Sequence, residues 1–470
     1  MKLKEFDFKL PKDEARKNKI IITSISVITL ILIITLSATF AYYQSIENQN
    51  PINTSVGEFS SGDLILAVTI DGVPSNNFPA KNAGYMVSDV TCDKGANGIW
   101  NNSLWSIKVG NLTQTKTTCN IAFISEIGTL VYEIKQQGGG ASAIEAKGAP
   151  IFNTTPTAAT SGIYAMEDEY GTSYYYRGER NSLNNNLIFA GFQWKIVRVN
   201  GDSSVRIIYN GTEANFNSLG TVNVMYTITQ IGTSAFNANY NDNKYIGYMY
   251  GGSNGVASPT LTQAQTNQTN STIKTYLDAW YVNNIATKGS SLTEKLADNL
   301  FCNDRQLGHD YPGAPTTGTG WNGSGFGVSV TYYSPYYRYY TNRSNLTPTF
   351  KCAQQNDRFT ASDENIGNAN LTYPVGLITG DEVAFAGGRY DVTYNSYYLY
   401  TNEAFWTLTS SHFNGSGAFA WFVGTNGSLD FNCANTVYCT LGVRPVLNLK
   451  SDSQVVLGNG SATSPFRIIW

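Results

Sequence analysis

The stretch FQWKIVRVNGDSSVRIIY, residues 192–209, decides the fold of the larger part of this chain. Apolar and polar residues alternate around Trp194 between Phe192 and Val199, with one break where two apolar residues adjoin at 196–197, and this is the period of a half-buried strand. The triplet Asn-Gly-Asp at 200–202 follows as a turn, and residues 205–209 resume the strand pattern. Two such runs joined through an Asn-Gly turn predict an antiparallel hairpin with Trp194 in the core.

Around this hairpin, residues 162–470 have the pattern of an α+β domain. The region is aromatic and strand-like, with two stretches of helical character. Within residues 272–285, apolar side chains fall on one helical face, at Ile273, Tyr276, Leu277 and Trp280. Residues 291–299 open with Ser-Leu-Thr-Glu, a sequence typical of a capped helix start.

A smaller domain precedes this region. Short alternating runs at residues 64–68, 105–109 and 119–123 are separated by Gly, Asn and Asp turns, so residues 45–125 predict a small all-β sandwich. Residues 126–161 contain three consecutive glycines and an Ala-, Thr- and Pro-rich stretch without periodicity. We therefore expect a linker there.

The composition limits the classes of function. Charged residues make up 14% of the 470 residues and aromatic residues 13%, with 31 tyrosines and a net charge of −3. Binding to nucleic acid requires basic patches that neutralise phosphates, and this chain does not have that charge balance. The composition predicts a polar but largely uncharged surface, and such a surface does not suit the binding of nucleic acid.

The N-terminus indicates export. Residues 1–19 form a basic tail that contains seven Lys and Arg against four acidic residues, which favours a cytoplasmic location. Residues 20–41 are uncharged and long enough to cross a hydrocarbon core of about 30 Å. They are either a single-pass membrane anchor or a signal peptide cleaved near Ala41. Both alternatives place the rest of the chain outside the cytoplasm, at the cell surface.

The even number of cysteines supports the same compartment, because exported chains usually pair them in disulfides. Sequence order suggests the pairs Cys92–Cys119, Cys302–Cys352 and Cys433–Cys439, although six cysteines allow 15 connectivities. A zinc site is less expected, since the chain has no Cys-x-x-Cys motif and only two histidines.

Short motifs near the N-terminus resemble a known family. The motifs ATFAYY at 38–43, NTSVG at 53–57 and SGDL at 61–64 are similar to the export segment and first strand of camelysin and TasA-like surface and biofilm-matrix proteins of Gram-positive bacteria. The resemblance is confined to this N-terminal part of the chain. It implies cleavage after Ala41 by a dedicated signal peptidase.

A second resemblance extends over most of residues 162–470. Its motifs are WKIVRV at 194–199, YLDAW at 276–280, FCNDR at 301–305, LTYPVGLIT at 371–379, FWTL at 405–408 and GVRPVL at 442–447. Together they resemble an uncharacterised extracellular domain family of Firmicutes, itself similar to the C-type lectin and formylglycine-generating-enzyme superfold. The resemblance implies a C-type-lectin-like α+β domain, but a fold alone does not confer a function.

The segment 332–340 is the first candidate binding site, with six tyrosines in nine residues between Cys302 and Cys352. Tyrosine offers a rigid flat ring and a hydroxyl at low entropic cost, which suits recognition surfaces. The predicted ligand-binding residues are Tyr332, Tyr333, Tyr336, Tyr337 and Tyr339. For each ring, packing beneath the loop is the alternative.

Residues 394–440 are the second candidate surface, rich in Asn, Ser, Gly and Tyr. In the lectin-like superfold this part carries ligand-facing loops, so the resemblance implies that Phe413, Asn414 and Asn426 are exposed and bind ligand. Trp406, Trp421 and Arg444 are expected in the core.

Catalysis is not expected. Formylglycine-generating enzymes hold copper with a cysteine pair, but Cys433 and Cys439 have a longer spacing and lack the Arg-Gly-Gly-Ser-Trp lead-in. The carboxylates that could bind calcium are Asp304, Asp310, Asp363, Glu364, Asp381 and Glu382. Their spacing matches no EF-hand loop, so we expect capping and turn roles and no cofactor.

These observations predict a cell-surface binding or adhesion protein that recognises an extracellular glycan or protein ligand. It would be attached to the membrane through residues 20–41 and would not bind nucleic acid. A self-assembling fibre or biofilm-matrix subunit is the main alternative. An extracytoplasmic enzyme of the formylglycine-generating type is less favoured.

Overall fold

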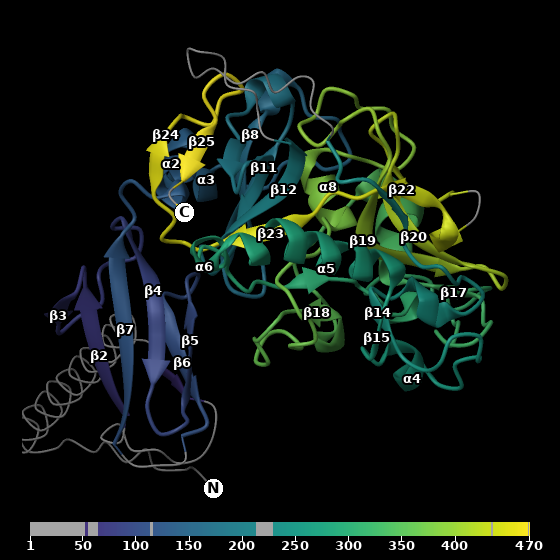
Figure 1. Ribbon diagram of the computed structural model, residues 1–470, viewed down its shortest axis with the longest axis horizontal. Coiled ribbons are helices and arrows are strands. Elements are labelled where there is room, and N and C mark those ends of the chain that lie inside the picture. The colour runs from purple at the N-terminus through teal and green to yellow at the C-terminus, as the bar shows by residue number, and fades with distance from the viewer. Residues whose placement is uncertain (1–51, 55–63, 113–115, 213–228, 434–435, 469) are drawn as a thin grey trace, which may run out of the picture.

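The structure is a computed structural model that describes residues 52–54, 64–112, 116–212, 229–433, 436–468 and 470. The predicted basic tail and apolar segment, residues 1–19 and 20–41, lie outside these residues. Among the residues that are described, no helix is both long and apolar enough to span a membrane. The described chain is mostly β-sheet with few helices, and it forms a small N-terminal domain beside a larger one (Figure 1).

The N-terminal domain consists of two facing sheets, with strand orders β3-β2-β7-β4 and β1-β6-β5. Val68 and Phe123 of the first sheet share a buried cluster with Ile107 of the second. Trp100 packs edge-on against Phe123, with ring centroids 5.3 Å apart. The three strands predicted in this region are present. The strands are β1 (Ile52–Thr54), β2 (Leu64–Ile70), β3 (Val73–Ser75), β4 (Tyr85–Cys92), β5 (Asn97–Asn101), β6 (Ser106–Gly110) and β7 (Thr117–Ser125).

The segment predicted as a linker, residues 126–161, contains two helices instead, α2 (Leu130–Gln137) and α3 (Ala141–Ala146). The Thr129 hydroxyl accepts a hydrogen bond from the Tyr132 amide at 3.2 Å and caps α2. Buried Ile134 and Ile144 belong to the core of the larger domain. The prediction was wrong here because each helix is too short to show a clear apolar period, and the three glycines that suggested a linker form the turn between them.

The larger domain contains an eight-stranded sheet with the path β23-β12-β11-β10-β25-β24, and β8 and β9 are joined to it through β11. The predicted hairpin is confirmed as β11 (Phe192–Val199) and β12 (Val205–Thr212), which pair antiparallel. Trp194 is buried, as expected. The other strands of this sheet are β8 (Gly162–Glu167), β9 (Thr172–Arg177), β10 (Asn186–Phe189), β23 (Val446–Leu449), β24 (Val455–Leu457) and β25 (Phe466–Ile468).

A six-stranded sheet forms the other half of this domain, with the path β13-β22-β19-β20-β21, and β17 pairs with β19. Trp406 and Trp421 are buried in it, and Arg444 is buried nearby, so the expected core positions are confirmed. The strands are β13 (Thr233–Ala235), β17 (Thr331–Tyr332), β19 (Phe405–Phe413), β20 (Ala418–Val423), β21 (Leu429–Asp430) and β22 (Thr440–Gly442). Two small pairs complete the set, β14 (Met249–Tyr250) with β15 (Thr269–Asn270) and β16 (Phe301–Cys302) with β18 (Arg358–Phe359).

The predicted helix at 272–285 is confirmed as α5 (Thr272–Asn284). The helix predicted at 291–299 is only the short α6 (Ser290–Thr293), because the chain then turns and its carbonyls and amides bond to other segments. The helix α8 (Gly380–Ala386) starts at a capping box formed by Thr379 and Glu382, as the acidic pair in the sequence indicated. A short helix, α4 (Leu261–Gln265), precedes α5.

All three predicted disulfides are present: Cys92–Cys119, Cys302–Cys352 and Cys433–Cys439. The first joins two directly opposed residues of β4 and β7, and the other two lie in the larger domain. Disulfides persist in oxidising environments, so they favour an extracytoplasmic location. A C-type-lectin-like topology for the larger domain stays a prediction.

Candidate functional site

Three tyrosines form a stripe on one side of the tyrosine-rich segment. The chain runs from β17 into the short helix α7 (Ser334–Tyr336) and then into the π-helical turn η6 (Tyr337–Thr341). The rings of Tyr332 and Tyr336 are stacked with centroids 4.4 Å apart, and Tyr340 lies 4.9 Å from Tyr336. All three rings are partly exposed. The spacing of four residues therefore produces a row of rings along one face.

Two neighbouring strands extend this row sideways. Tyr332 of β17 lies opposite His412 of β19, which in turn lies opposite Phe419 of β20. The rings of His412 and Phe419 are parallel, with centroids 4.4 Å apart and an interplanar angle of 4°. Directly opposed residues of paired strands share one face of the sheet, so the rings form a continuous row across three strands.

Further rings border this row. Trp321 lies 5.2 Å from Tyr332, and Tyr390 lies 5.0 Å from Tyr340, between ring centroids. Buried Phe431 packs beneath, against Tyr336, Tyr340 and Tyr390. We call the partly exposed rings the aromatic platform: Trp321, Tyr332, Tyr336, Tyr337, Tyr340, Tyr390 and Phe419.

The platform is electrically neutral at its centre. Burial lowers the pKa of His412 to about 3, so the imidazole is uncharged at neutral pH. Burial, followed by the adjacent tyrosines, raises the pKa of Tyr336, so its hydroxyl stays protonated. The surface can therefore stack against a ring or an apolar face and can exchange neutral hydrogen bonds through its hydroxyls.

A buried ion triad anchors the segment that carries the stripe. Arg338 is 1% exposed, and its guanidinium lies 2.5 Å from an Asp304 carboxylate oxygen and 2.6 Å from one of Asp381. Asp304 follows β16 and Asp381 belongs to α8, so the triad ties three distant segments together. Removing one partner of such a triad would leave a buried charge without compensation.

The predicted exposure is wrong for three of the candidate residues. Tyr333 and Tyr339 are each 1% exposed, and Phe413 is fully buried. The Tyr333 hydroxyl donates to Asn243 Oδ1 at 3.0 Å, and Tyr339 packs edge-on against Trp421 at 5.0 Å between centroids. The segment turns into a helix, and Tyr333 and Tyr339 lie on its inward side. Tyr332, Tyr336 and Tyr337 remain partly exposed.

Asn414 and Asn426 are exposed, as expected, but each is occupied in its own turn. The Asn414 Oδ1 accepts the amides of Ser416 and Gly417, both at 2.9 Å. The Asn426 Oδ1 accepts the Ser428 amide at 3.0 Å and the Ser428 hydroxyl at 2.7 Å. Both side chains thus stabilise hairpin turns, which is a common role of asparagine.

Several acidic residues considered as calcium ligands have other partners. Asp304 and Asp381 bind Arg338, and Glu382 lies 2.7 Å from Arg206 and 3.1 Å from Arg198. Within the described ranges, no group of three or more His, Cys, Asp or Glu side chains is arranged to hold a metal ion. Cys433 and Cys439 are bonded to each other, so neither is a thiol in this structure.

Four platform residues were missed by the sequence reasoning: Trp321, Tyr340, Tyr390 and Phe419. The spacing of Tyr332, Tyr336 and Tyr340 could have identified Tyr340, because positions four apart share a helical face. Trp321 lies in the loop that leads into β17, and Tyr390 and Phe419 come from distant segments. No local pattern relates these three residues to the stripe. No protein-family model, curated protein or solved structure matches this chain.

Proposed function

We propose that this chain is an extracytoplasmic recognition protein that binds a neutral glycan by stacking it on the aromatic platform. The observation that carries the proposal is the stripe of Tyr332, Tyr336 and Tyr340, in which the first two rings are stacked, the third is tilted against them, and all three are partly exposed along one face. Sugar rings have apolar faces edged by hydroxyls. A tyrosine row presents matching apolar area and hydroxyls at low entropic cost.

The absence of charge at the centre of the platform supports a neutral ligand. His412 is uncharged at neutral pH, because burial lowers its pKa to about 3. A cation lies only at the end of the described stripe, where the Arg343 guanidinium is 5.3 Å from the Tyr340 ring centroid. An anionic ligand would lack a buried partner for its charge, which makes its desolvation costly.

A glycan array probed with the full chain in detergent would test this function. Any neutral glycan that binds is then titrated against the double variant Tyr336→Ala/Tyr340→Ala and against Tyr438→Ala. Tyr438 is a suitable control because it is 51% exposed and lies outside the platform. We expect the double variant to lose at least tenfold in affinity while the control is unchanged. The proposal would be refuted if the double variant bound a neutral glycan as tightly as the control variant did. Binding of charged glycans alone would refute it as well.

Attachment to a membrane through residues 20–41, with the N-terminus inside, belongs to the same proposal. The three disulfides support an exported location for the rest of the chain. The same proposal includes a lectin-like fold for the larger domain. It rests on the resemblance of that domain to an uncharacterised extracellular domain family of Firmicutes.

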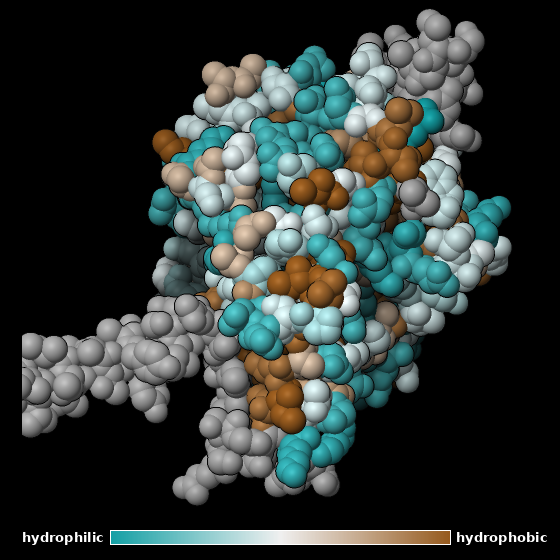
Figure 2. All heavy atoms as spheres, turned by 90° about the vertical axis from the view of Figure 1, so that its left-hand side faces the viewer, coloured by the Kyte–Doolittle hydropathy of each residue, from teal (hydrophilic) through white to brown (hydrophobic). Residues whose placement is uncertain are grey.

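Self-assembly into a surface fibre is the second candidate, favoured by one feature of the N-terminal domain. Among the described strands, β3 is at the edge of its sheet, with Val73 66% exposed, and Ile65 of the adjoining strand is 50% exposed. Apolar groups also interrupt the polar surface on the side of the molecule shown in Figure 2. An exposed edge strand is a template for pairing with another chain. Sedimentation that depends on protein concentration and is abolished by Val73→Lys would favour this function.

A further inference from the structure

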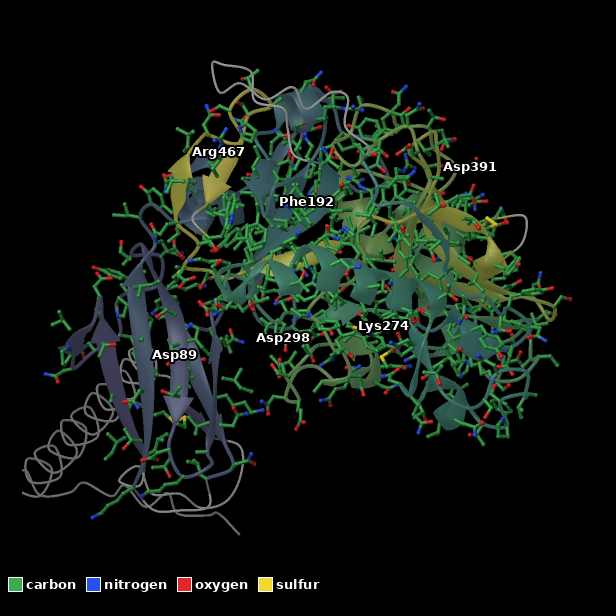
Figure 3. All side chains as sticks on the ribbon, in the orientation of Figure 1. Asp89, Phe192, Lys274, Asp298, Asp391 and Arg467 are labelled. Carbon is green, nitrogen blue, oxygen red and sulfur yellow. A yellow bond between two sulfur atoms is a disulfide. The ribbon has the colours of Figure 1, made fainter. Side chains whose placement is uncertain are left out.

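A groove of about 540 Å³ lies on the larger domain, away from the residues of the aromatic platform. One wall is the first half of α5, on which Figure 3 labels Lys274. The other walls are β15, Tyr250 and the following loop, and the segment around Asn239. A volume of several hundred Å³ is within the range of small-ligand sites.

The chemistry of the walls is uniform. None of the described lining side chains carries a charge, and amides, hydroxyls and two tyrosine rings predominate. The nearest charged pair, Lys274 and Asp278 on α5, is internally neutralised at 2.6 Å, and the Lys274 side chain is fully buried. The groove therefore disfavours an ionic ligand, which would lose its hydration without gaining a counter-charge.

Several lining amides have unused hydrogen-bonding capacity. The Asn254 Oδ1 accepts from the Tyr250 hydroxyl at 2.8 Å, which leaves the Asn254 amide nitrogen to donate. Asn270 makes only a long contact of 3.5 Å to Asp278. Asn239, which is partly exposed, makes no side-chain hydrogen bond to any described residue. Each amide both donates and accepts, and this is the capacity that a hydroxyl-bearing ligand needs.

We propose that this groove binds a neutral saccharide, independently of the aromatic platform. Tyr276 is partly exposed in the wall and presents a ring against which a sugar could pack. The asparagines supply paired donors and acceptors for hydroxyls, and the uncharged walls exclude anionic and cationic ligands. The chain would then have two carbohydrate sites on one domain, which raises avidity for a polymeric ligand when both are engaged.

The test uses the full chain in detergent and three neutral probes, maltotriose, cellotriose and chitotriose, with a sulfated disaccharide as the charged probe. Thr275→Arg fills the groove from an exposed position of α5 that lines it. Asn283→Arg is the matched control, because Asn283 is exposed on the same helix and does not line the groove. Saturation-transfer NMR and calorimetric titration measure binding.

We expect at least one neutral probe to bind, with at least a tenfold loss of affinity in Thr275→Arg and no change in Asn283→Arg. The platform variant Tyr336→Ala/Tyr340→Ala should leave that groove affinity unchanged, which separates this proposal from the proposed function of the platform. The proposal is overturned if no neutral probe binds, if Thr275→Arg binds as well as the control, or if the sulfated probe competes in the groove with equal affinity.

Discussion

The ring of Tyr336 lies parallel to the ring of Tyr332, with centroids 4.4 Å apart and an interplanar angle of 3°. Tyr332 ends strand β17, and Tyr336 ends the helix that follows it, so the stack bridges two kinds of secondary structure. Tyr336 also contacts Trp321, His412 and Phe431. It is therefore the central ring of the platform, and its removal should affect binding more than the removal of any ring at the rim.

Substitutions of Tyr336 can separate stacking from hydrogen bonding. Tyr336→Phe keeps the ring and removes only the hydroxyl, so we expect affinity for a bound glycan to fall by less than about threefold, well under the 1.4 kcal/mol that a tenfold change represents. Tyr336→Ala removes the ring and should cost about tenfold or more. Calorimetric titration of both variants measures the difference. Equal losses in the two variants would show that the ring does not stack on the ligand.

Arg338 and Arg343 lie five positions apart in the same segment but should differ sharply in their contribution to stability. Arg338 is buried between Asp304 and Asp381, whereas Arg343 is exposed. Arg338→Met leaves the two buried carboxylates without their cationic partner and should lower the free energy of unfolding by about 3–5 kcal/mol. Arg343→Met should change it by less than about 0.5 kcal/mol. Urea unfolding measures both values, and similar values would contradict the structural role of the triad.

Lys195 should make stability depend on pH. Its amino group is buried and donates to Asn186 Oδ1 at 2.6 Å, and burial, followed by Arg180 and Arg444, lowers its pKa to about 7. Between pH 7 and the ordinary pKa near 10.4, the unfolded chain holds a proton that the folded chain has lost. The free energy of unfolding therefore rises with pH in this window.

The variant Lys195→Met isolates this effect. Urea unfolding at pH 7 and at pH 9 should show a gain in stability for the wild-type chain and a smaller gain, or none, for the variant. Arg180→Gln tests the cause of the shift. It keeps the lysine but removes one of the neighbouring charges that lower the Lys195 pKa, so that pKa should be lowered less than in the wild-type chain. An identical pH dependence in wild type and Lys195→Met would rule out Lys195 as the titrating group.

Local patterns predicted the hairpin around Trp194, the helix α5 and the disulfide pairs, because each depends on residues near in sequence or on simple pairing. The same reasoning missed α2 and α3, since glycines at their ends resemble a linker. It also treated Tyr333 and Tyr339 like Tyr332, although burial depends on which way the segment turns. The partners that bury them, Asn243 and Trp421, are set by long-range packing that no local pattern contains.

The two disulfides of the larger domain differ in the loop that they close, and this predicts their relative contributions to stability. Cys302 and Cys352 are 50 positions apart, whereas Cys433 and Cys439 are 6 apart. Loop-closure entropy in the unfolded chain gives about 4 kcal/mol for the longer loop and about 2 kcal/mol for the shorter one. Replacing each pair with serines, confirming the remaining bonds by intact mass, and unfolding each variant in urea would measure these losses. A larger loss for the Cys433–Cys439 pair would show that folded-state contacts, and not chain entropy, dominate the effect of these bonds.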